Sequence, residues 1–158
     1  MSEDELIRYG RSLPGVIVDT VGEGSGAPQI AWGDSFFYFD PDDDPQNRLH
    51  PFTTIVTKDY TGFDEASDLD RPGVFRLNIA VGRAAFVDLL GYAPSQHAEH
   101  AGEFDYTQLD ELLPHPVYAA QGWVSILNPG EWTLETAKGL IADARDLAAK
   151  RHDRRASH

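Results

Sequence analysis

Five segments of the chain are rich in β-branched and aromatic residues, which is typical of β-strands. In residues 73–81, large apolar side chains occupy every second position, so they share one face of the predicted strand. That face is Phe75, Leu77, Ile79 and Val81, and the opposite face is Val74, Arg76, Asn78 and Ala80. The other predicted strands are residues 16–21, 29–39, 53–58 and 117–127, with the glycine-rich residues 22–28 as a turn.

Helical spacing appears near both ends of the chain and after the fourth strand. Ser2 and Glu5 have the spacing of a capping box and begin a short helix. Residues 83–90 form a second predicted helix, and residues 106–113 one or two helical turns. After Asn128-Pro129-x-Glu131, apolar residues recur at helical spacing, which predicts a closing helix of about 20 residues.

Most of the strands precede most of the helices, which favours an α+β fold over a doubly wound one. We expect an antiparallel sheet of about five strands, with helices on one face and a long C-terminal helix. A chain of 158 residues is the size of one domain. We assign residues 1–152 to that domain and residues 153–158 to a frayed polar tail.

Composition narrows the range of partners. The chain has 26 acidic and 13 basic residues and a formal net charge of −13, and most of the excess lies before Gly73. Such a charge disfavours nucleic acids and anionic membranes as partners. There is no cysteine, no apolar stretch long enough to span a membrane and no secretory signal, so we expect a cytoplasmic protein.

Two polar segments resemble metal sites in composition only. The acidic run at residues 40–45 lacks the glycine and the closing glutamate of a calcium-binding EF-hand loop. His97 and His100 stand three residues apart, but the surrounding residues 94–102 indicate an exposed loop. We therefore expect no metal and no cofactor.

Basic residues near the middle of the acidic chain are candidates for a binding site. Lys58, Arg76 and Asn78 lie at or within predicted strands and could form a pocket for an anion or a carboxylate. Alternatively, Asp68 or Asp70 pairs with Arg76 or Arg71 in a network that only anchors the loop 59–72. The pattern does not decide between these alternatives.

Aromatic residues suggest a binding surface on the second face of the sheet. In residues 36–39, Phe36 and Tyr38 point to one face of the strand, and Phe37 and Phe39 point to the other. Helices would cover one face, so a loop, a ligand or a second copy of the chain must cover the other. Later in the chain, His115 lies between two prolines and is either part of a simple turn or a fixed acid/base group.

Two resemblances add to this picture. The runs at residues 51–60 and 67–78 resemble an uncharacterised actinobacterial family, a domain of unknown function, over nearly the whole chain, which implies no activity. The chain is also similar to the MmcQ/YjbR-like architecture, which is sometimes described as DNA-binding. That similarity rests on Leu13-Pro14-Gly15-Val16, Trp32-Gly33, residues 75–90 and residues 123–149. The acidic loops at residues 40–45 and 59–70 stand where DNA binding would need a basic face.

Three functional hypotheses follow. The first is a non-catalytic binding domain for a small anionic or aromatic ligand or for a protein partner. The second is a small enzyme with His115 as acid/base, an aspartate of the 59–70 loop and Arg76 as electrophile. The third is nucleic-acid binding, which the charge disfavours, and a homodimer competes with all three. The candidate ligand-binding residues are Lys58, Asp68, Arg71, Arg76, Asn78, His115 and Trp123.

Overall fold

The computed structural model describes residues 2–22, 24 and 28–156. These residues form a six-stranded antiparallel sheet with the strand order β1-β2-β3-β4-β6-β5. The strands are β1 (Val16–Thr20), β2 (Ser35–Phe39), β3 (Thr53–Val56), β4 (Arg76–Ala80), β5 (Leu112–Pro114) and β6 (Trp123–Leu127). The α-helices are α1 (Glu3–Ser12), α2 (Gly82–Leu90), α3 (His97–His100) and α4 (Leu134–Ala156). The predicted α+β class, with its long C-terminal helix, is confirmed.

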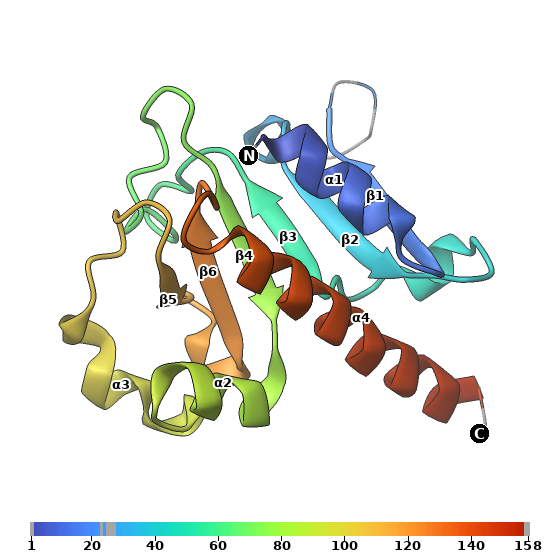
Figure 1. Ribbon diagram of the computed structural model, residues 1–158. Coiled ribbons are helices and arrows are strands. Elements are labelled where there is room, and N and C mark those ends of the chain that lie inside the picture. The colour runs from blue at the N-terminus through green and yellow to red at the C-terminus, as the bar shows by residue number, and fades with distance from the viewer. Residues whose placement is uncertain (1, 23, 25–27, 157–158) are drawn as a thin grey trace.

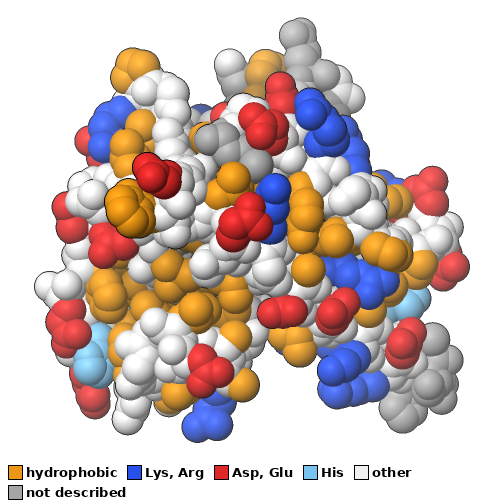
Figure 2. Space-filling view, viewed as in Figure 1, with side chains coloured by type: hydrophobic (Ala, Val, Ile, Leu, Met, Phe, Trp, Pro, Cys, Tyr) orange, Lys and Arg blue, Asp and Glu red, His pale blue; other side chains and the backbone are white. Residues whose placement is uncertain are grey.

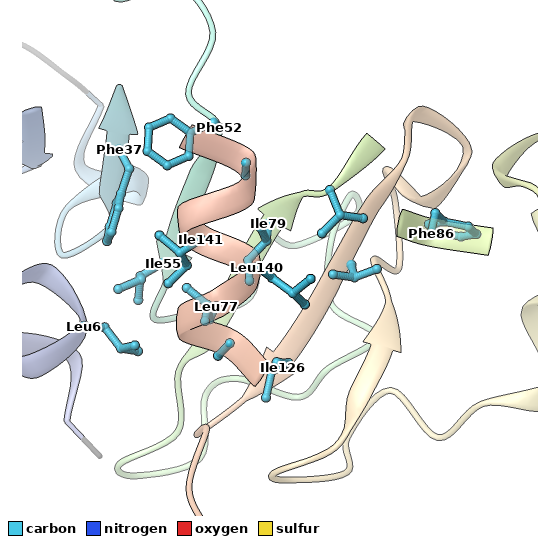
Figure 3. Close-up of a cluster of buried hydrophobic side chains, with 14 of the residues drawn as sticks. Leu6, Phe37, Phe52, Ile55, Leu77, Ile79, Phe86, Ile126, Leu140 and Ile141 are labelled. Carbon is cyan, nitrogen blue, oxygen red and sulfur yellow. The ribbon is translucent and has the colours of Figure 1, made fainter. Parts of the chain in front are cut away.

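One face of the sheet, here called the inner face, carries the main apolar core. Figure 1 shows α1 and α4 lying across this face. Figure 3 shows side chains from the strands and from α4 meeting in the core, and the prediction that alternate residues of β4 face it is confirmed. The core includes Leu6, Phe37, Ile55, Phe75, Leu77, Ile79, Val81, Ile126 and Ile141.

The helix α4 joins the two ends of the chain across the inner face. The hydroxyl of Tyr9 on α1 donates a hydrogen bond to the carbonyl of Lys138 at 3.0 Å. Farther along α4, Arg145 donates from Nε to the carbonyl of Pro14 at 2.9 Å. Its guanidinium lies 4.9 Å from the ring centre of Phe39 on β2. The N-terminal helix and hairpin are therefore held by the last helix of the chain.

All five predicted strands are shorter in the structure than expected, and two of them are about half the predicted length or less. Of residues 29–39, only Ser35–Phe39 form β2, because residues 29–31 form a 3₁₀ turn and Gly33 has a φ of +94°. Of residues 117–127, only the part after Gly122, with a φ of +85°, is extended. Most of the predicted turn at residues 22–28 lies outside the described residues.

The structure contains a strand where helical turns were expected. Residues 112–114 form β5, which pairs with β6 at the edge of the sheet. Its three residues are too short to show alternation, and leucines at positions 109, 112 and 113 also fit helical spacing. Pro114 is tolerated there because an edge strand has an unpaired side. In the predicted loop at residues 94–102, residues 97–100 form the short helix α3.

The closing helix starts later than its sequence pattern indicated. Asn128 lies outside α4 and instead binds the start of β4, accepting from Phe75 N and donating to the carbonyl of Gly73, both at 2.9 Å. The chain before α4 is held by Asp110, whose carboxylate accepts from the backbone amides of residues 130, 132 and 133. The role of Asp110, which is about 20 residues away in the sequence, could not be inferred from local residue spacing. The helix continues through Ala156, beyond the expected boundary at residue 152.

Candidate functional site

The face of the sheet opposite the helices, here called the outer face, is polar along its centre. The strand register places Phe36, Thr54, Asn78 and Ser125 side by side on four neighbouring strands. Asn78 links this row, because its amide donates to Thr54 Oγ1 at 3.0 Å and its Oδ1 accepts from Ser125 Oγ at 2.8 Å. The alternation that builds the core therefore also builds a polar floor on the other side of the sheet.

The long connection between β3 and β4 folds over part of the outer face. Leu69 is buried there in a small apolar cluster with Val56, Leu113 and Leu127. Asp59 accepts from the amide of Leu69 at 2.9 Å, which joins the two ends of the connection. The covering loop leaves one part of the sheet open as a pocket.

This pocket, here called the outer pocket, has a volume of about 470 Å³. Its floor is polar, and its walls are mainly aromatic rings from β2, β6 and the loops after β3 and β5. The lining residues are Phe36, His50, Pro51, Thr54, Val56, Tyr60, Phe63, Asp64, Arg76, Asn78, His115, Tyr118 and Trp123. Volumes of roughly 300–1,000 Å³ with largely apolar walls are usual for small-molecule sites.

Arg76 on β4 is the centre of the buried polar network, with 1% of its surface exposed. Its Nε donates to Asn78 Oδ1 at 2.7 Å, and its Nη1 donates to Ser67 Oγ at 2.9 Å. Nη1 and Nη2 bind the two carboxylate oxygens of Asp64 at 2.9 and 2.5 Å. This bidentate pair neutralises the guanidinium and fixes its plane.

Asp64 is the acidic partner of Arg76. Burial opposes its ionisation, but the hydrogen bonds and the charge of Arg76 outweigh burial and hold the pKa of Asp64 below its ordinary value. The tight turn from Tyr60 to Asp64 is closed by backbone hydrogen bonds between these two residues. This turn therefore brings one charged group and two aromatic rings to the pocket.

His115 lies directly after β5, with 3% of its surface exposed. Its Nδ1 accepts from the backbone amides of Val117 and Tyr118, each at 3.0 Å. Burial and the nearby charge of Arg76 lower the pKa of His115 to about 3, although Asp64 opposes the shift. The imidazole is therefore neutral near pH 7.

Aromatic rings frame the opening of the pocket. Phe63 and Tyr118 are 59% and 41% exposed, and their ring centres lie 6.2 Å apart in an edge-on arrangement. Trp123 stands edge-on to His115 with 6.3 Å between ring centres. Tyr60 is held by a hydrogen bond from its hydroxyl to Asp34. Large exposed rings beside a pocket are unusual on a monomer surface and are typical of binding sites.

The structure brings four of the seven candidate residues together in this pocket: Arg76, Asn78, His115 and Trp123. The other three lie elsewhere. Lys58 donates from Nζ to the carbonyl of Trp32. Arg71 lies 3.7 Å from Asp68 and donates to the carbonyls of Ser67 and Thr107, so this pair anchors the loop.

The expected partners of Arg76 were Asp68 or Asp70, whereas the structure pairs Arg76 with Asp64. Sequence reasoning also did not assign Tyr60, Phe63 and Tyr118 to the site. The available signal was the run Tyr60-x-x-Phe63-Asp64 at the start of the acidic loop, which combines two aromatic rings with one acid. An ion-pair network and a pocket coexist here, so the two alternatives, a binding pocket and a network that anchors the loop 59–72, are compatible.

A second cavity of about 400 Å³ lies on the other side of His50 and Pro51. Arg151, Arg154 and Arg155 of α4 line it, and all three side chains are exposed. Among the described residues, no group of three or more His, Asp or Glu side chains is arranged to hold a metal ion. No helix in the described part of the chain is long and apolar enough to cross a membrane.

The fold and the outer pocket define an α+β protein with one buried and one partly open sheet face. The chain belongs to a family of unknown function, DUF6194, whose family model matches residues 1–157. No curated protein and no solved structure matches the chain.

Proposed function

We propose that the protein is a non-catalytic binding domain that holds a small aromatic ligand in the outer pocket. The observation that carries this proposal is the combination of aromatic walls with a buried, hydrogen-bonded polar floor. Rings of a ligand would stack or pack edge-on against Phe63, Tyr118 and Trp123. The rigid floor would then set the orientation of the ligand.

The charge of the site favours a neutral ligand over an anionic one. Asp64 already neutralises Arg76, and Lys58 binds a backbone carbonyl instead of lining the pocket. An anion in the pocket would approach the Asp64 carboxylate and would enter the field of a chain with a net charge of −13. The aromatic part of the sequence-based hypothesis therefore has more support than the anionic part.

The alternative of an enzyme with His115 as acid/base has less support. A general base near pH 7 needs an available lone pair and a pKa near that pH. Nδ1 of His115 is occupied by two backbone amides, and the pKa of the ring lies far below neutrality. These features suit a fixed hydrogen-bond donor better than a proton shuttle.

Nucleic-acid binding and dimerisation have no specific structural support. On the face shown in Figure 2, basic side chains occur in small groups interspersed with acidic ones, whereas DNA binding would need a continuous basic surface. The exposed rings of Phe63 and Tyr118 could contact a second copy of the chain, but they are also the rim of the outer pocket.

Two tryptophan variants test the proposal. We expect α-methylstyrene, a neutral aromatic probe, to shift the backbone amide NMR signals of residues 60–64 and 115–123. Trp123→Leu should weaken this binding about tenfold, because an aromatic wall is lost. Trp132→Leu is the matched control, because Trp132 is 80% exposed and does not line the pocket. Equal effects of the two variants, or shifts confined to other residues, would contradict the proposal.

A further inference from the structure

The buried polar floor contains a contact whose character depends on the tautomer of a histidine. Nη2 of Arg76 lies 3.4 Å from Nε2 of His115. Arginine has only donors, so this contact is favourable only if Nε2 carries a lone pair. The tautomer of His115 therefore decides what this part of the pocket can bind.

The backbone around His115 fixes that tautomer. The amides of Val117 and Tyr118 both point at Nδ1, so Nδ1 must carry the lone pair. In a neutral imidazole the proton then resides on Nε2. Pro116 contributes to this arrangement, because it has no N–H of its own and restricts the backbone that presents the two amides.

Two N–H groups consequently converge on one point, and none of the described residues places an acceptor between them. Nη2 of Arg76 gives one hydrogen to Asp64 and directs the other toward His115, while Nε2–H of His115 faces Arg76. Arg76 is 1% exposed and His115 is 3% exposed, and both line the outer pocket. Buried donors without acceptors are costly, so this pair favours the binding of an acceptor atom.

Charge determines which kind of acceptor fits. A carboxylate or phosphate at this point would share Nη2 with the carboxylate of Asp64 and would be repelled by it. A carbonyl oxygen has two lone pairs, so it can accept from both N–H groups without adding charge.

We propose that the outer pocket recognises a planar, neutral, carbonyl-bearing ligand, whose oxygen accepts hydrogen bonds from His115 Nε2–H and Arg76 Nη2–H. This inference rests on the proposed function, since the aromatic walls hold the rings of the same ligand. His115 acts as a neutral donor whose orientation the 114–118 turn fixes.

The first test needs no ligand. Long-range ¹H–¹⁵N NMR of the histidine side chains reports which ring nitrogen of His115 is protonated. We expect a protonated Nε2 and an unprotonated Nδ1 at neutral pH. A protonated Nδ1 would overturn the inference, because Nε2 would then accept from Arg76 and the pair of free donors would not exist.

The second test compares two probes of nearly the same shape. Acetophenone carries a carbonyl oxygen where α-methylstyrene carries a CH₂ group. In NMR titrations we expect the protein to bind acetophenone about tenfold more tightly, as for one or two neutral hydrogen bonds made in a buried site. We expect benzoate, which is planar but anionic, to bind more weakly than acetophenone.

The matched variants are His115→Asn and Trp123→Leu. An asparagine at position 115 has an oxygen near the place of Nδ1, so it keeps the acceptor for the two amides but removes the Nε2–H donor. His115→Asn should abolish the preference for acetophenone over α-methylstyrene, whereas Trp123→Leu should weaken the binding of both probes equally. Equal binding of the two probes to the unaltered protein would overturn the carbonyl site alone. Failure of both probes to bind would overturn the proposed aromatic pocket and this inference with it.

Discussion

The two faces of the sheet are made by the same strands but are stabilised in different ways. On the inner face, Leu77 and Ile79 of β4 pack among many apolar neighbours. On the outer face, Arg76 and Asn78 of the same strand are buried in a network in which each polar atom depends on a particular partner. Apolar packing tolerates small changes, whereas a buried charge without its partner is strongly destabilising.

The largest expected effect comes from breaking the outer-face network at Asp64. Asp64→Leu leaves the guanidinium of Arg76 buried without a counter-charge, and arginine cannot become neutral by losing a proton. We expect a loss of about 3–5 kcal/mol in the free energy of unfolding, measured by urea denaturation. The double variant Asp64→Leu/Arg76→Met should recover most of that loss, because it buries two apolar side chains instead. A double variant as unstable as the single one would contradict this account.

The second prediction concerns the inner face directly beside Arg76. Leu77→Ala removes a fully buried side chain from the core and should cost about 3 kcal/mol in the free energy of unfolding. The affinity of the folded protein for acetophenone should not change, because Leu77 points away from the outer pocket. A fall in affinity comparable to that of Trp123→Leu would show that the two faces are not independent.

The third prediction is a pH dependence that originates on the outer face. The pKa of His115 is about 3 in the folded protein and near its ordinary value of 6.5 in the unfolded chain. Between these pH values the unfolded state binds one more proton than the folded state, so the free energy of unfolding should fall by up to about 1.4 kcal/mol per pH unit as the pH falls from 6.5 towards 3. Well above pH 6.5 the histidine is neutral in both states and the effect vanishes.

Urea denaturation at a series of pH values measures this dependence, with His115→Asn as the control. The charged groups that face His115 are Arg76 and Asp64, and the pKa of Asp64 lies below its ordinary value of 3.8. Above pH 4, the contribution of this cluster to the pH dependence of stability therefore comes mainly from His115. The stability difference between the protein and the control should shift with pH in that window, and a constant difference would contradict the assignment.

The smallest expected effect on stability is at the rim of the outer pocket. Phe63→Ala removes a ring that is 59% exposed, so the free energy of unfolding should change by less than about 0.5 kcal/mol. Binding of acetophenone should nevertheless weaken several-fold. Leu49→Ala is the control, because Leu49 is 68% exposed and outside the pocket. Equal binding by the two variants would exclude the rim from the site.

The fold was largely predictable because alternation within β4 and helical spacing within α4 are strong local signals. Boundaries were less predictable where long-range contacts determine them. The chain before α4 is held by Asp110, which lies on a different part of the chain. β5 exists because β6 pairs with it, and three residues are too few to carry a pattern.

The candidate site was predictable in part for the same reason. Arg76 and Asn78 stand on a face fixed by strand alternation, so their position side by side could be inferred, whereas the burial of that face could not. The pairing of Arg76 with Asp64, and not with Asp68 or Asp70, depends on how the loop 59–72 closes, and residue spacing does not determine this. Lys58 lies two residues after β3, and its side chain reaches the carbonyl of Trp32 instead of the pocket.

The position of α4 has a consequence for the order in which the protein can fold during synthesis. The contacts that hold α1 and the first hairpin come from Lys138 and Arg145, near the end of the chain. While the ribosome is still making these residues, Leu6 and Phe37 lack their cover from α4. The N-terminal third therefore cannot complete its packing until α4 has been synthesised, and a chain that stops before α4 would expose an apolar sheet face to other proteins.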